Sequence, residues 1–193
     1  DLNDVFDLDK ISAVERSLRA QKLCADFDSA PVATIALVEG HCVGKGLEIA
    51  LACRHIVCTA DARFRFPEIL LGFIPGSGGE RLLKARVIGP VADEVLVTGR
   101  WVEAEEAFRV GLVEKVVPQI PAELTEAGIL ELLDGCPRKP FPAHSFKVDH
   151  EFARTYSIVL SGREARKRIA ERLGELGKRS EERRVGKECR SRW

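Results

Sequence analysis

The stretch from Val38 to Gly79 limits the fold more than any other part of the chain, because two acids stand in it among apolar residues and glycine-rich turns. The turn Gly44-Lys45-Gly46 leads into an apolar run, Leu47 to Cys53, whose one acid is Glu48. This order predicts a helix that begins at the second glycine, because glycine suits the turn and the apolar run suits a buried face. The second acid, Glu68, follows a proline, which predicts the start of another helical turn.

The helix start and the two acids together indicate chemistry at an acyl carbonyl. The first N–H groups of a helix have no acceptor inside the helix, and the helix dipole favours negative charge beside them. Fixed donors of this kind stabilise an oxyanion or enolate more than a neutral carbonyl, which is the difference that catalysis requires. Glu48 can then hold a proton or a water beside that carbonyl, and Glu68 supplies a second proton position. In an apolar pocket the pKa values of two such acids separate, so that one is protonated while the other is ionised.

Several segments resemble the crotonase family, the enoyl-CoA hydratase and isomerase superfamily. EGHCVGKGLEIALAC, from Glu39 to Cys53, is similar to the helix that carries one donor of the family's oxyanion hole. PEILLGFIPGSGG, from Pro67 to Gly79, is similar to the second catalytic element, and TGRWVEAEEAFRVGLVEKVVP, from Thr98 to Pro118, to a later conserved pattern of the family. The opening Asp1-Leu2 resembles the end of an AGADL motif, so the resemblance covers roughly Asp1 to Gly177.

The resemblance implies a fold, a site and a reaction. The fold is α/β, a crotonase-like spiral of ββα units followed by C-terminal helices, with the N-terminal part missing. The reaction is syn addition of water to the double bond of an α,β-unsaturated acyl-CoA, with isomerisation, thioester hydrolysis, decarboxylation or a non-catalytic scaffold as alternatives. The implied residues are Glu48 and Glu68 as catalytic acids, the N–H of Lys45 in the oxyanion hole, Gly76 for positioning the water, and Gly44, Gly46 and Pro75 for binding substrate.

Three residues depart from the family pattern. Lys45 stands where Gly or Ala is usual, so we expect its side chain to turn away from the acyl group or to meet a charged part of the ligand. Arg54 stands where Asp is common, and Arg65 where Gly is common. Arg65 is expected to crowd the pocket or to pair with Glu68, which would lower the pKa of that acid.

Composition limits the remaining possibilities. At 193 residues and 45% hydrophobic content, the chain is long enough for one domain with a sizeable core. Equal numbers of basic and acidic residues, 30 each, give no bias towards nucleic acid or an anionic membrane, and no apolar stretch is long enough for a transmembrane helix. Six irregularly spaced cysteines, mostly in apolar runs, suggest reduced core residues of a cytoplasmic protein without a metal site.

The two ends of the chain need separate interpretation. Residues 1–143 are expected to form a partial crotonase core and residues 144–178 the start of the C-terminal helical region. The tail, Arg179 to Trp193, has no apolar period and resembles a translated sequencing adapter, which predicts a non-native segment. The glycine-rich turn expected before Asp1 is absent, so we expect an internal fragment of a longer enzyme that holds half of the oxyanion hole.

Periodicity predicts the elements around the site. Strands are expected at 31–38, 55–59, 64–66 and 112–117, and helices at 1–28 with a break near 7–9, 82–97, 104–110, 121–133 and within 144–177. The segment around Lys45 lacks the spacing of a phosphate-binding loop, and the glycines lack that of a dinucleotide fingerprint. His41 and His55 are expected to be structural, and Lys147 to be a surface residue rather than a contact for phosphate.

These expectations define one candidate protein. It would use acyl-CoA as substrate, with coenzyme A as part of that substrate and no other cofactor and no metal. No nucleic acid or membrane partner is expected. Full-length protein would form a homotrimer or hexamer, by analogy with the family.

Overall fold

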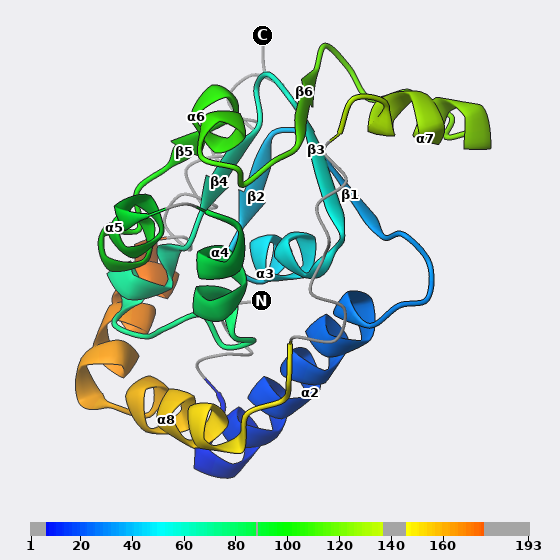
Figure 1. Ribbon diagram of the computed structural model, residues 1–193. Helices are drawn as coiled ribbons and strands as arrows, with labels where there is room; N and C mark the ends of the chain where they lie inside the picture. The colour runs from blue at the N-terminus through cyan, green and yellow to red at the C-terminus, as the bar shows by residue number, and fades with distance from the viewer. Residues whose placement is uncertain (1–6, 88, 137–145, 176–193) are drawn as a thin grey trace, which may run out of the picture.

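The computed structural model describes residues 7–87, 89–136 and 146–175. Strands in these residues form two three-stranded sheets, ordered β1-β3-β6 and β2-β4-β5. The first sheet contains β1 (Ile35–Val38), β3 (His55–Thr59) and β6 (Lys115–Val117), and the second contains β2 (His41–Val43), β4 (Arg63–Arg65) and β5 (Val102–Glu103). Because consecutive strands pass from one sheet to the other, β1 to β2 and β3 to β4, the chain advances as a spiral of repeating units (Figure 1).

Pairing between the repeats is parallel. Ile35 pairs with His55 and Val38 with Cys58 in the first sheet, while Val43 pairs with Arg65 in the second. The third strand of the second sheet, β5, is antiparallel to β4. Parallel pairing of strands from successive repeats stacks corresponding parts of the chain on one another, and it brings the chain after β2 close to the chain after β4.

The helices cover the two sheets. Their bounds are α2 (Lys10–Asp28), α3 (Lys45–Ala52), α4 (Gly79–Arg86), α5 (Pro90–Thr98), α6 (Ala104–Arg109), α7 (Glu126–Leu133) and α8 (His150–Leu160), with a 3-10 helix, η1, at Pro67–Leu71. Residues 163–175 are also helical. The short α3 lies at the centre of the molecule with α4 beside it on the left, and α2 and α8 lie side by side below (Figure 1).

One apolar core joins α3 to both sheets and to α4–α6. Leu47 and Leu51 of α3 are fully buried against Phe64 and Phe66, which flank Arg65 on and after β4. Burying such a side chain stabilises the fold by about 1.5–3 kcal/mol relative to exposure. The segments that carry Glu48 and Glu68 are therefore fixed by the main core of the protein.

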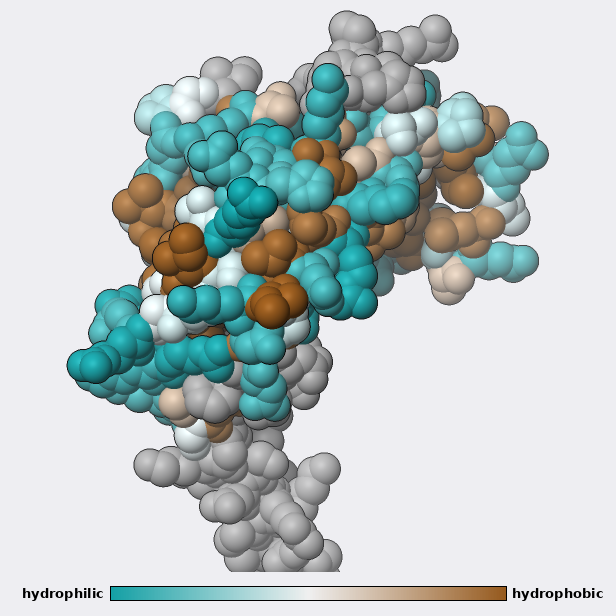
Figure 2. Space-filling view, turned by 90° about the horizontal axis from the view of Figure 1, so that it is seen from below, coloured by the Kyte–Doolittle hydropathy of each residue, from teal (hydrophilic) through white to brown (hydrophobic). Residues whose placement is uncertain are grey.

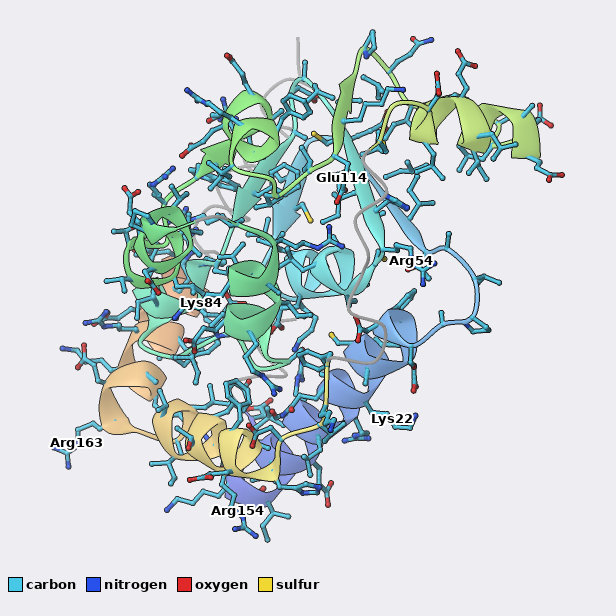
Figure 3. The ribbon with its side chains drawn as sticks, in the orientation of Figure 1. Lys22, Arg54, Lys84, Glu114, Arg154 and Arg163 are labelled. Carbon is cyan, nitrogen blue, oxygen red and sulfur yellow. The ribbon has the colours of Figure 1, made fainter. Side chains whose placement is uncertain are left out.

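A buried ion pair closes the C-terminal end of α3. Arg86 Nη1 lies 2.9 Å from Glu114 Oε1, with both side chains nearly inaccessible. Arg86 also donates to the carbonyls of Leu51 and Cys53, which end α3, and Glu114 Oε2 accepts from Ile56 N at 2.6 Å. Figure 3 shows Glu114 inside the molecule, whereas Lys22, Arg154 and Arg163 point away from it. Arg86 thus supplies donors for the carbonyls at the end of α3, and Glu114 supplies an acceptor for an N–H of β3.

A polar bridge joins α2 to α8 beneath the core. Gln21, fully buried, donates to the carbonyl of Asp149 at 3.1 Å and accepts from the Asp149 N–H at 2.7 Å. At the other end of α2, Asp9 and Ser12 form a reciprocal capping box. The predicted helix with a break near residues 7–9 is confirmed for α2, which begins at Lys10.

Other predicted elements differ in their bounds. The predicted helix 82–97 is two helices, because Gly89, at φ 67°, and Pro90 begin a new helix after α4. The helix predicted at 121–133 begins only at Glu126, where the Thr125 side chain caps it. The short strands β2, of three residues, and β5, of two, were not predicted.

Some predictions lie outside the described residues. These are the Asp1-Leu2 motif, the proline-rich connection 137–142 and the tail 179–193.

The surface combines charged residues with scattered apolar side chains. Ile11, Val97 and Ile158 are each more than two-thirds exposed. Seen from below, apolar patches are interrupted by hydrophilic side chains (Figure 2). None of the helices in the described part of the chain combines the length and apolar character that crossing a membrane requires.

Candidate active site

The first part of the site is the N-terminal end of α3. Gly44 is its N-cap, at φ 53°, a conformation that side chains rarely adopt. Its N–H donates to the carbonyl of Arg65 at 2.9 Å, and its carbonyl accepts from Glu48 N at 3.0 Å. The helix therefore begins at Lys45, one residue earlier than predicted, because the carbonyl of Gly44 closes the first turn. The N–H groups of that turn have no acceptor within the helix.

Glu48 lies in the interior on the first turn of α3 and is fully buried. Its Oε1 accepts from the backbone N–H of Ser77 at 2.7 Å and of Gly79 at 2.9 Å. A Cβ on Gly79 would lie 2.9 Å from both Glu48 Oε1 and the Phe66 ring. The glycine-rich segment at the start of α4 thus binds one oxygen of the Glu48 carboxylate. A side chain at position 79 would clash with that oxygen.

The Lys45 side chain folds back onto Glu48. Its Nζ lies 2.9 Å from Glu48 Oε2 and donates a hydrogen bond to Ser77 Oγ. The contact with Oε2 is an ion pair by distance but lacks hydrogen-bond direction, and Oε2 has no directed hydrogen bond from any described residue. Distance governs the attraction between the charges, so we treat the contact as an ion pair that is easily displaced. The expectation that Lys45 turns away or meets a ligand charge did not foresee this internal partner.

Glu68 lies on η1, against the beginning of α3. A Cβ on Gly44 would lie 2.7 Å from Glu68 Oε1, so the carboxyl packs directly on that glycine. Glu68 Oε2 is buried and has no hydrogen-bond partner among the described residues. Burial raises the pKa of Glu68 to about 7, and the Glu48 charge adds to this rise, while the Glu68 N–H and Lys45 oppose it. Glu68 is therefore a carboxyl that can give or take a proton near neutral pH.

The predicted pairing of Arg65 with Glu68 is wrong. Arg65 lies instead with Trp101 in the lining of a groove, where its Nε donates to the Gly99 carbonyl and its guanidinium lies 5.2 Å from the centre of the Trp101 ring. His41 stacks on the same ring, with centroids 5.0 Å apart, which agrees with a structural role. Because side chains along a strand point alternately to its two faces, Arg65 points away from the core, into which Phe64 and Phe66 point. The pKa of Glu68 is accordingly raised, not lowered.

Sequence reasoning missed the residues that surround Gly76. A Cβ on Gly76 would lie 2.9 Å from the Tyr156 ring of α8, and the Gly76 carbonyl accepts from Ser17 of α2 at 2.6 Å. Tyr156 is buried, and burial raises its pKa to about 12. These partners come from distant segments without a motif, so no local signal could have identified them. The role of Gly76 in positioning a water stays a prediction.

The other predicted residues lie at different distances from the two acids. Gly46 is in the first turn of α3, and a Cβ there would meet no atom within 4 Å. Pro75 lines a separate hollow of about 280 Å³ between η1, α4, α5 and α8. Arg54 follows α3, where its N–H donates to Thr34 Oγ1 at 2.8 Å. Lys147 contributes its carbonyl to Arg81, and its side chain is exposed.

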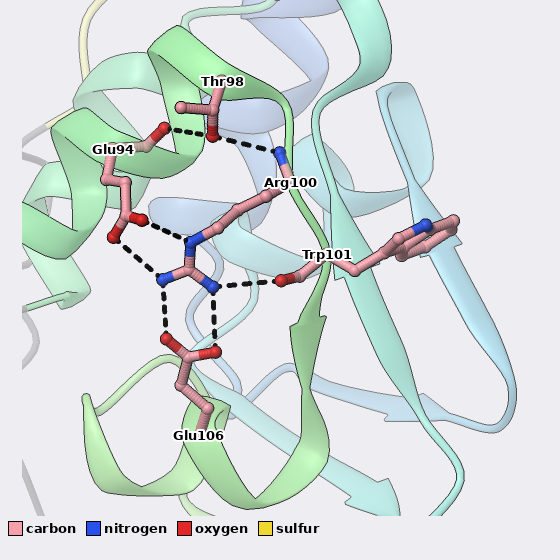
Figure 4. A network of polar contacts seen from close by, with 5 residues as sticks. All are labelled: Glu94, Thr98, Arg100, Trp101 and Glu106. Carbon is pink, nitrogen blue, oxygen red and sulfur yellow. Dashed lines mark hydrogen bonds and ion pairs between the residues drawn. The ribbon is translucent and has the colours of Figure 1, made fainter.

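Arg100 forms ion pairs with two helices, α5 and α6, close to η1. Arg100 Nε lies 3.0 Å from Glu94 of α5, and its Nη2 lies 2.6 Å from Glu106 of α6 (Figure 4). Arg100 Nη2 donates to Glu106 and, at 3.1 Å, to Glu94, and these hydrogen bonds raise the pKa of Arg100. The preceding Gly99, at φ 60°, approaches so closely that a Cβ would lie 2.9 Å from the Phe66 carbonyl and from Ile69. The Thr98-Gly99-Arg100 motif is thus structural, and it fixes the residues on either side of Glu68.

A groove of about 650 Å³ opens next to the segments that carry the two acids, although neither acid is among its lining residues. Its apolar lining includes Val43 and Pro67, the residues immediately before Gly44 and Glu68, together with Leu71. Arg168 and Arg172, from the helical residues 163–175, line the other side. Among the described residues, no three His, Cys, Asp or Glu side chains come together as a metal ion would need.

The interleaved sheets and the site at the start of α3 define a crotonase-like protein, and comparisons agree. The sequence pattern of the enoyl-CoA hydratase/isomerase family matches residues 1–173. The chain therefore belongs to the enoyl-CoA hydratase/isomerase family.

The chain is also similar to solved structures of bacterial proteins named enoyl-CoA hydratase. That of Bacillus anthracis is 30% identical, with a TM-score of 0.55 over 58% of this chain and 43% of that one. One from Geobacillus kaustophilus is 33% identical, with a TM-score of 0.53 over 54% and 40%. One from Mycobacterium avium, 21% identical, shows the fold, with a TM-score of 0.69 over 86% of this chain and 69% of that one. This chain thus spans less than half the length of the first two proteins.

Proposed function

We propose that the protein carrying this chain hydrates the double bond of α,β-unsaturated acyl-CoA. The observation that supports this most is the Glu68 carboxyl, which packs on Gly44 at the start of α3 with Oε2 buried and unpartnered among the described residues. An acid with a pKa of about 7 suits proton transfer at the carbon next to a carbonyl. The Lys45 N–H, in the first turn of α3, is proposed as one donor to the carbonyl oxygen.

In this proposal the two acids have different tasks. Glu48 takes a proton from water, whose oxygen bonds to Cβ while the π electrons move onto the thioester oxygen. Glu68, protonated, then gives its proton to Cα, which restores the carbonyl and completes the addition of one water. The first-turn N–H groups of α3 stabilise the intermediate enolate. No metal or redox cofactor takes part, and assembly into trimers or hexamers stays a prediction.

Isomerisation of the double bond is a second candidate, and one observation favours it. Glu48 Oε2, the oxygen that water would need, lies 2.9 Å from Lys45 Nζ. Isomerisation needs only Glu68, which removes a proton from Cα of a 3-enoyl thioester and returns one to Cγ. A non-catalytic scaffold would instead bind acyl-CoA and convert neither thioester.

Substitution of Glu68 by Gln tests the proposal in the protein encoded by the complete reading frame. We expect hydration of a 2-enoyl thioester, followed by the mass of water added, to slow by at least about 100-fold, because general acid catalysis contributes this much. Glu105→Gln, at an exposed glutamate of α6, is the matched control and should keep the parental rate. An unchanged rate in Glu68→Gln would refute the role of this acid.

A further inference from the structure

The position of the Lys45 side chain has a consequence for the reaction. Lys45 and Glu48 are three residues apart on α3, so their side chains share one face of the helix. The Lys45 side chain is 44% exposed, whereas that of Glu48 is completely buried. The lysine therefore reaches from solvent to a buried carboxylate.

Only one oxygen of Glu48, the buried Oε2, has lone pairs that no hydrogen bond from a described residue uses. Oε1 already accepts from two backbone donors, Ser77 N and Gly79 N, which use its two lone pairs. Any water that gives its proton to Glu48 must therefore approach Oε2. The Lys45 ammonium now lies at that oxygen, 2.9 Å away, and its bond to Ser77 Oγ holds it there.

Glu68 faces no such competitor. Its Oε2 is buried without a hydrogen-bond partner among the described residues, and its nearest constraint is Gly44, which has no side chain. The Lys45 charge acts on Glu68 only at a distance, by opposing the rise of its pKa, and does not occupy its free oxygen. A reaction that needs both acids depends on the lysine, and a reaction that needs Glu68 alone does not.

We propose that Lys45 determines the ratio of hydration to isomerisation, because its ammonium competes with the reacting water for Glu48 Oε2. The inference rests on the proposed function and adds a specificity-determining side chain to it. With the ammonium on Oε2, the enolate can only be reprotonated, so a 3-enoyl thioester gives the 2-enoyl product with no change of mass. With the ammonium turned into solvent, water binds, Glu48 takes its proton, and the product gains one oxygen and two hydrogens.

The contact is suited to competition rather than to a permanent block. The ion pair lacks hydrogen-bond direction, and the exposed lysine stem has solvent in which its ammonium can be hydrated. A water that donates to Oε2 with good geometry can replace it. The lysine then sets how often the hydration site is open.

Lys45→Met tests the proposal, since methionine keeps much of the length and removes the charge. In the protein encoded by the complete reading frame, both reactions are measured, hydration of a 2-enoyl thioester by mass and isomerisation of a 3-enoyl thioester by NMR of the double bond. We expect the ratio of the hydration kcat to the isomerisation kcat to rise by about tenfold, which corresponds to about 1.4 kcal/mol. The gain should lie in kcat rather than KM, because the lysine competes with water and not with the thioester.

Two further variants separate this role from a structural one. Lys45→Arg keeps the cation and should keep the parental ratio. Lys22→Met makes the same change at an exposed lysine that pairs with Asp26 on α2, and it should also leave the ratio unchanged. A ratio in Lys45→Met within twofold of the parent, or an equal loss of both reactions, overturns the inference.

Glu68→Gln distinguishes failure of the inference from failure of the proposed function. If Glu68→Gln abolishes both reactions while Lys45→Met leaves their ratio unchanged, only the role of Lys45 is wrong. If Glu68→Gln converts both thioesters at the parental rate, or the parent converts neither, the proposed function fails and the inference fails with it.

Discussion

The two glutamates lie in opposite kinds of environment, although their segments meet at the start of α3. Glu48, on an α-helix, is held by two backbone N–H groups and an ammonium. Glu68, on a 3-10 helix, has a buried oxygen without a hydrogen-bond partner in the described part of the chain. A carboxylate with donors around it is stable in its place, whereas one without donors is costly to bury when charged. The first environment favours position, and the second favours proton transfer.

This contrast also separates residues of the site from those that only support the fold. Glu114 is also buried, but it accepts from β3 and is paired with Arg86, which donates to the end of α3. Glu106 and Glu94 hold Arg100 behind η1. Burial of an acid is thus no sign of function, and the lack of donors at Glu68 is the feature that distinguishes it.

The largest effect should follow from crowding Glu68. In Gly44→Ala, the new Cβ would lie 2.7 Å from Glu68 Oε1, and the backbone would be strained at φ 53°. We expect the hydration rate to fall by about 100-fold or more, as measured with a 2-enoyl thioester, because the acid must move from its place beside α3. Gly40→Ala has similar strain, at φ 64°, but no atom within 4 Å of the Cβ, so it should retain the rate. Equal losses in both variants would show that strain alone is responsible.

Substitution of the well-bound acid should affect stability. Glu48→Gln replaces a carboxylate oxygen by an amide NH₂, which must face either the donors at Ser77 and Gly79 or the ammonium of Lys45. We expect the free energy of unfolding, measured by urea denaturation, to fall by about 2–3 kcal/mol. Glu105→Gln is again the exposed control. A loss under about 0.5 kcal/mol, the usual range of surface substitutions, would contradict the contrast between the two acids.

Substitution of Glu68 should raise the free energy of unfolding rather than lower it, and by a smaller amount. Because the folded pKa of Glu68 is raised to about 7 from 4.5, its charge destabilises the fold progressively as the pH rises from about 4.5 through 7. Glu68→Gln, which carries no charge, should therefore be more stable than the parent at pH 8, by about 1–3 kcal/mol, and similar to it at pH 4. Urea denaturation at both pH values measures this difference. A loss of stability at pH 8 would mean that Glu68 has partners when it is charged.

Local patterns were sufficient to predict much of the fold. The short helix after Gly44 was predicted because a glycine turn leads into an apolar run, and the strand at residues 55–59 because its run is short and of β type. Resemblance, rather than periodicity, distinguished a spiral from a doubly wound sheet. The strand order β1-β3-β6 depends on long-range pairing that no short window contains.

The site was predicted less completely than the fold. Glu48, Glu68 and the glycines stand in recognisable motifs, and the structure brings both acids to the start of α3. The direction of Arg65 depended on its neighbour Trp101, and that of Lys45 on a serine 32 residues later in the chain. The direction of a side chain depends on neighbours that are distant in the sequence, which is why the sequence suggested an Arg65–Glu68 pair that does not form.

The two hydrogen bonds to Glu48 Oε1 also determine which substitutions the site tolerates. Ser77 and Gly79 contribute main-chain groups, so most exchanges of the Ser77 side chain leave the donor in place, and only proline would delete an N–H outright. The contact at Oε2 depends instead on the Lys45 side chain. Within a single carboxylate, the hydrogen bond from the Ser77 N–H therefore tolerates most substitutions, whereas the bond from Gly79 requires glycine and the contact at Oε2 requires Lys45.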